Sequence, residues 1–84
     1  MKLPRDLSGD TLVKALRRLG YEVTRQTGSH IRLTTSQRGE HHVVVPRHNS
    51  LRVGTLAGIL RDVENHFGIT RQELLARIVG PEHG

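Results

Sequence analysis

The chain has 84 residues, enough for one hydrophobic core and therefore for one domain. Its 13 Lys and Arg outnumber its 8 Asp and Glu and give a net charge of +5; eleven of the 13 are arginine, whose planar guanidinium suits phosphate and carboxylate. It has no cysteine, which excludes disulfides and zinc–thiolate sites and is typical of a reducing compartment.

The sequence shows no signal for secretion or membrane insertion. The N-terminal residues lack an apolar core of signal-peptide length, and no later segment approaches the roughly 20 apolar residues of a membrane helix. We expect a cytoplasmic protein that forms a single domain over residues 1–84, with a core over about 7–79 and loose ends. Its basic balance favours nucleic acid or an acidic protein as partner over a neutral metabolite.

The first predicted element is a helix that begins after Ser8, a good N-cap residue, and ends at Gly20. Apolar residues recur between them at helical spacing. Residues 21–26 then alternate between apolar and polar and predict a half-buried strand, with Tyr21 and Val23 toward the core. A turn follows over residues 27–29, where Gly28 supplies a positive φ.

Two more strands complete a predicted antiparallel sheet. In residues 30–34, Ile31 and Leu33 face the core, while His30, Arg32 and Thr34 face the other side. A turn at residues 36–39 leads to a β-branched strand over residues 42–45, which Pro46 ends.

Two helices follow the sheet. Gly54 and Thr55 open the first, whose apolar residues lie at i, i+3, i+4 and i+7. Residues 70–73 have the spacing of a capping box for the second, and Gly80 with Pro81 would end it. The sequence therefore predicts an α+β fold of order α-β-β-β-α, as in double-stranded-RNA-binding domains. Its helices lie on one face of a three-stranded antiparallel sheet, and a short helix follows at the C-terminus.

His30 is the residue best placed for chemistry, because it follows a glycine turn and shares a strand face with Arg32. An imidazole with an ordinary pKa of about 6.5 can take the proton of a ribose 2'-OH, and an arginine can hold the scissile phosphate. On the residues alone, a solvent-exposed histidine at a strand end is the commoner interpretation. His48, beside Arg47 after the third strand, either lines a site or caps a turn.

The remaining polar residues narrow the choice of function. Adjacent residues His41 and His42 point to opposite sheet faces and cannot easily share a metal ion, so we expect neither a metal nor another cofactor. His66 is interpreted as a helix-surface residue. Tyr21 and Phe67 are core candidates, which leaves no aromatic platform for stacking bases. Several arginines surround the strands and the following loop, where they could form one positive surface; they are Arg25, Arg32, Arg38, Arg47 and Arg52.

From about Leu7 to Leu75 the sequence resembles the HicA mRNA interferase family. The resemblance rests on four blocks: Ser8-Gly9 with a helix ending Leu19-Gly20-Tyr21, Arg25-Gln26-Thr27-Gly28-Ser29-His30-Ile31, Val44-Val45-Pro46-Arg47-His48, and Gly54-Thr55-Leu56 with Ile59-Leu60-Arg61. Gly-Ser-His is the family's active-site signature. The resemblance thus implies metal-independent cleavage of mRNA by His30 and neutralisation by a HicB-type antitoxin.

The site that we expect combines this resemblance with the positions of the basic residues. His30 would act on the ribose 2'-OH and leave a cyclic phosphate, while the neighbouring residues bind RNA phosphate; these are Arg25, Gly28, Ser29, Arg32, Arg47 and His48. Two alternatives remain open: a non-catalytic RNA-binding module on the same basic face, and an interaction protein that docks an acidic partner. The chain departs from the family pattern at His41-His42, where Arg or Lys with a polar residue is more usual.

Overall fold

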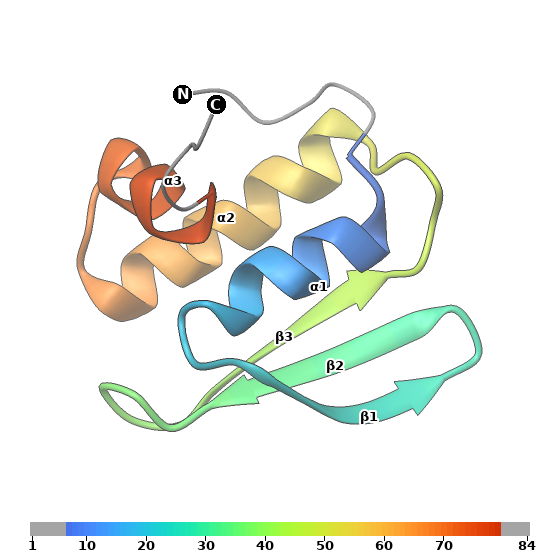
Figure 1. The fold of residues 1–84 in the computed structure, drawn as a ribbon, viewed down its shortest axis with the longest axis horizontal. Coiled ribbons are helices and arrows are strands. Elements are labelled where there is room, and N and C mark those ends of the chain that lie inside the picture. The colour runs from blue at the N-terminus through green and yellow to red at the C-terminus, as the bar shows by residue number, and fades with distance from the viewer. Residues whose placement is uncertain (1–6, 80–84) are drawn as a thin grey trace.

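The computed structural model describes residues 7–79 and confirms the predicted α+β architecture. Its elements are α1 (Gly9–Arg17), β1 (Glu22–Thr27), β2 (His30–Thr35), β3 (His41–Pro46), α2 (Val53–Phe67) and α3 (Arg71–Val79). The strands form an antiparallel sheet in the order β1-β2-β3. All three helices lie on one side of this sheet (Figure 1). We call the other side the open face.

The helix ends form as their local sequences predict. The Ser8 hydroxyl accepts a hydrogen bond from the Thr11 N–H at 3.1 Å, and Gly20 takes a φ of 92° just after α1. At the start of α3, the Thr70 N–H donates to the Glu73 carboxylate at 2.9 Å and the Glu73 N–H donates to the Thr70 hydroxyl at 3.1 Å, which is a capping box. The stop predicted at residues 80 and 81 lies outside the described residues.

The core lies between the helices and the sheet. Tyr21 and Phe67 are both buried, as expected, and their rings meet edge to face at 6.2 Å. The other large buried side chains come from every element except β1; they include Leu12, Leu16, Leu33, Val45, Val63, Leu74 and Ile78. No helix within residues 7–79 is long and apolar enough to cross a bilayer.

The prediction of a half-buried strand over residues 21–26 is wrong. Tyr21 is buried but precedes β1, and all six residues of β1 are exposed. Val23, expected to face the core, keeps 45% of its surface exposed. The reason is that α1 and α2 pack on β3, whereas β1 is the far edge strand. The pairing of β1 with β2 also shifts register between Val23 and Arg25, which breaks the alternation of faces.

Candidate active site

His30 lies where the sequence places it, at the start of β2 directly after a tight turn. Gly28 has the expected positive φ of 54°, and Thr27 pairs with His30 across the turn. His30 is exposed, whereas Ile31 and Leu33 are buried in the core. Because alternate residues share a face of a strand, His30 lies on the open face together with Arg32.

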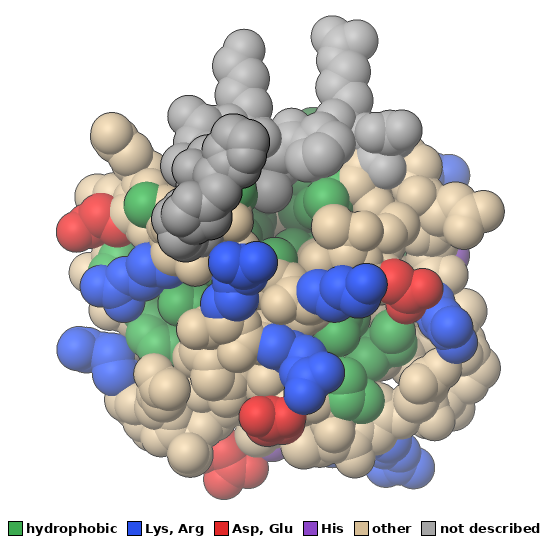
Figure 2. Space-filling model, in the orientation of Figure 1, with side chains coloured by type: hydrophobic (Ala, Val, Ile, Leu, Met, Phe, Trp, Pro, Cys, Tyr) green, Lys and Arg blue, Asp and Glu red, His purple; other side chains and the backbone are tan. Residues whose placement is uncertain are grey.

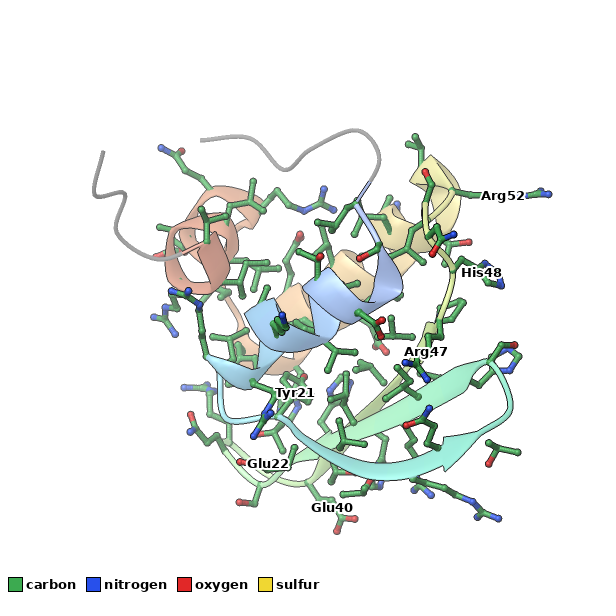
Figure 3. All side chains as sticks on the ribbon, turned by 45° about the vertical axis from the view of Figure 1, so that its right-hand side comes forward. Tyr21, Glu22, Glu40, Arg47, His48 and Arg52 are labelled. Atoms are coloured by element: carbon green, nitrogen blue, oxygen red, sulfur yellow. The ribbon has the colours of Figure 1, made fainter. Side chains whose placement is uncertain are left out.

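A second segment is tied to this turn by the backbone. The Arg47 N–H donates to the Ser29 carbonyl at 2.6 Å, which places the loop after β3 against the residue that precedes His30. The Arg47 guanidinium forms a half-exposed ion pair with Asp10 of α1 at 3.3 Å. Figure 3 shows Arg47 and His48 following one another along this loop, beyond the end of β3. His48 is exposed and makes no side-chain hydrogen bond with residues 7–79, so the structure does not use its ring as a cap.

The loop is held from the other side by the first residue of α1. The Gly9 N–H donates to the His48 carbonyl at 2.9 Å. A Cβ at Gly9 would overlap the Pro46 carbonyl oxygen and lie 3.2 Å from the Arg47 Cα. Only glycine lets α1 come this close. The cap pattern at Ser8 indicates where the helix starts but not this packing role of Gly9, because the pattern is local and the contact spans about 40 residues.

Two arginines meet on the open face. Arg25 pairs with Arg32 in the β1–β2 register, and both line an open hollow of about 360 Å³ with Thr24, Thr34, Glu40 and His42. We call this the open-face hollow. Of these residues, the sequence predicts only Arg25 and Arg32 as part of a site. The others were missed because a register shift in β1 and the pairing of β2 with β3 bring them together, and no local pattern shows either.

The two adjacent histidines face opposite sides of the sheet, as predicted. His42 lies at the open-face hollow, with Nδ1 2.7 Å from the Thr34 hydroxyl and Nε2 3.0 Å from the Glu40 carboxylate. His41 faces the helices, with Nδ1 2.7 Å from the Tyr21 hydroxyl. Within residues 7–79, no group of three or more His, Asp or Glu side chains could hold a metal ion.

His66 is not the plain surface residue that the sequence suggested. Its ring stacks on His41 with centroids 4.3 Å apart, and its Nε2 lies 2.9 Å from the Gln37 carbonyl oxygen. Burial raises the pKa of the neighbouring Tyr21 hydroxyl, and the charge of Asp62 raises it further. These groups lie near the start of β3, whereas His30 pairs with Pro46 at its other end.

The arginines do not form one continuous surface. Arg25 and Arg32 share the open face, Arg47 lies by the turn before His30, and Arg38 occupies the β2–β3 turn at the opposite end of the sheet, with a φ of 57°. Figure 2 shows Lys and Arg side chains spread over the visible face of the molecule, with acidic side chains among them. The structure thus brings the predicted residues together as two groups, one around His30 and one at the open-face hollow.

These observations define a small α+β domain that exposes a histidine beside a glycine turn on a basic, helix-free sheet face. The family described as HicA toxin of bacterial toxin–antitoxin matches residues 9–64, which run from α1 through the sheet into α2. The match covers more than half of the chain, so the chain belongs to the HicA toxin family of bacterial toxin–antitoxin systems. No curated protein and no solved structure matches the chain.

Proposed function

We propose that this toxin is an endoribonuclease that cleaves mRNA, with His30 as its catalytic residue. The observation that supports this most strongly is the position of His30. It is exposed at the start of β2, directly after a turn whose Ser29 carbonyl accepts a hydrogen bond from the Arg47 N–H. The backbone of His30 is held in the sheet while its imidazole is exposed, as is needed for a general base that must reach a bound nucleotide. Membership of a toxin family supports a harmful activity over simple RNA binding.

The proposed reaction uses the ribose 2'-OH as nucleophile. His30 takes the proton of this hydroxyl as its oxygen attacks the adjacent phosphorus. A bond forms between O2' and phosphorus while the bond to the 5'-oxygen of the next nucleotide breaks, and that oxygen takes a proton from solvent. The products are a 2',3'-cyclic phosphate and a 5'-hydroxyl end. Dependence on the 2'-OH restricts the reaction to RNA.

The residues around His30 would bind the phosphates of the substrate. The N–H groups of Gly28 and Ser29 lie in an exposed turn that phosphate can approach. Arg47 and His48 follow from the adjoining loop, and Arg25 with Arg32 form a second positive group on the open face. We further propose that a HicB-type antitoxin neutralises the protein by covering the His30 side of the domain in the cytoplasm.

The test is RNA cleavage by the purified protein in the presence of a chelator, for wild type, His30→Ala and Arg61→Ala. Arg61 is exposed on α2, in the helix layer, and serves as the control. We expect cleavage products with cyclic phosphate ends from wild type and Arg61→Ala, and none from His30→Ala with an unchanged melting temperature. Equal cleavage by wild type and His30→Ala would refute the catalytic role, and RNA binding without cleavage by wild type would favour a binding module.

A further inference from the structure

The pairing of Arg25 with Arg32 is unfavourable within the protein itself. Side chains directly opposite on neighbouring antiparallel strands lie within contact range, and like charges in such positions destabilise the sheet. Neither guanidinium forms an ion pair with a carboxylate of residues 7–79, in contrast to Arg17, Arg47 and Arg71. A bound anion between the two guanidinium groups would remove this repulsion.

The open-face hollow gives such an anion a defined place. Arg25 and Arg32 line it, and His42 is the third residue there whose side chain carries nitrogen. The Nε2 of His42 lies 3.0 Å from the carboxylate of Glu40. Thr34 at Nδ1 holds the other side of the ring. His42 is therefore fixed in orientation, as a residue that contacts a ligand would be.

The open-face hollow extends along β2 away from His30. Arg32 lies two residues after His30 on β2, about 7 Å along the strand, and Thr34, which pairs with His42, lies four residues after it, about 13 Å along the strand. We propose that the open-face hollow binds a phosphate of the same RNA strand beyond the scissile one, through Arg25 and Arg32, with His42 as an additional contact. This inference rests on the proposed cleavage of RNA at His30.

Glu40 acts as a built-in competitor for the same positive groups. Its carboxylate lines the open-face hollow and pairs with His42, and Figure 3 shows its side chain on the side of the sheet away from the helices. An RNA phosphate that enters has to compete with this charge. Glu40→Gln keeps the shape of the side chain and removes its charge, so this substitution should strengthen binding of the RNA backbone.

The first experiment measures binding separately from cleavage. The probe is a short single-stranded RNA with methylated 2'-oxygens, which cannot be cleaved, titrated over a range of salt concentrations against the full chain. Removing one phosphate contact should lower the slope of log K against log salt by about 0.7 and weaken binding about fivefold at low salt. We expect this for Arg25→Ala and Arg32→Ala, tighter binding for Glu40→Gln, and no change for Arg61→Ala.

Two results of this titration would overturn the proposal. One is a set of slopes that does not differ between wild type, Arg25→Ala and Arg32→Ala. The other is displacement of the RNA by inorganic phosphate at an equal concentration of phosphate groups, which would make the open-face hollow a site for the free ion.

The second experiment uses substrate length. A dinucleoside monophosphate has only the scissile phosphate, whereas a longer oligoribonucleotide can also fill the open-face hollow. Wild type and Arg61→Ala should therefore cleave the longer substrate with a higher kcat/KM, and Arg25→Ala should lose this advantage. If Arg25→Ala slows both substrates equally, the proposal is wrong. If no variant cleaves RNA of any length, the proposed function fails, and the binding titration alone decides whether the open-face hollow takes an RNA phosphate.

Discussion

Replacing Gly9 with alanine tests whether the approach of α1 to the loop after β3 is as tight as the structure shows. The added Cβ would overlap the Pro46 carbonyl oxygen and lie 3.2 Å from the Arg47 Cα. Both contacts are with backbone, which cannot move aside as the end of a flexible side chain can. We expect α1 and the loop to separate, which weakens the hydrogen bond from the Gly9 N–H to the His48 carbonyl.

Two opposing effects set the size of the change. Overpacking typically costs about 1–3 kcal/mol. Replacing glycine with alanine also adds about 0.4–1 kcal/mol to the free energy of unfolding, because alanine restricts the unfolded chain. The net expectation for Gly9→Ala is a loss of about 1–2 kcal/mol, and each 1 kcal/mol lowers the melting temperature of a domain this small by about 4–8 °C. Urea and thermal unfolding followed by circular dichroism measure both quantities.

Gly58→Ala is the matched control within the same chain. Gly58 lies inside α2, and a Cβ there would meet no atom within 4 Å apart from its chain neighbours and the nearby backbone of its own helix. Without a clash, alanine should stabilise the protein by about 0.5–1 kcal/mol. Opposite signs for the two glycines are the expected result. If Gly9→Ala also stabilises the protein, α1 does not approach Pro46 as closely as described, and the inferred support of the Arg47–His48 loop is wrong.

Three further substitutions test other parts of the structure. The folded protein raises the pKa of Tyr21, so its neutral hydroxyl contributes fully to stability below the pKa of about 10 in the unfolded chain, and this contribution declines as pH rises above that value. Tyr21→Phe should lack this alkaline decline when the free energy of unfolding is measured by urea titration at several pH values. Parallel plots of that free energy against pH for wild type and Tyr21→Phe would contradict this. The hydrogen bonds from Thr70 lower the pKa of Glu73 in the folded protein. Wild type should therefore have a higher melting temperature than Glu73→Gln at pH 7, and this difference should vanish as pH falls through the lowered pKa. A difference that persists in acid would refute the capping role. Leu33→Ala removes a fully buried side chain and should cost about 2–5 kcal/mol; a loss below 1 kcal/mol would show that the core collapses around the site.

The fold was largely predictable because its determinants are local. Ser8 and Thr70 mark helix starts through side chains that bond the next turn, and Ile31 with Leu33 shows the period of a strand with one buried face. The failure at β1 has a non-local cause. Alternation predicts a buried face only if something covers it, and the helices pack on β3 at the other edge of the sheet.

The candidate site was predictable only in part for the same reason. His30, Gly28 and Arg32 are neighbours in sequence, so turn and strand geometry are enough to place them together. The Arg47 N–H bond to Ser29 and the contact between His41 and His66 join residues far apart in the chain, and no local pattern indicates either of them. The resemblance to HicA toxins makes His30 the candidate catalytic residue, whereas composition and charge alone favour a surface histidine.

The hydrogen bond between the Arg47 N–H and the Ser29 carbonyl has a consequence for the order in which the protein acquires its site during synthesis. A ribosome adds Ser29 and His30 well before it adds Arg47 and the rest of the loop that joins β3 to α2. Until that loop is made, the turn before His30 lacks its partner and α1 has no β3 end to pack against. The arrangement around His30 therefore requires the chain as far as His48, and a fragment that carries only the first hairpin does not contain it.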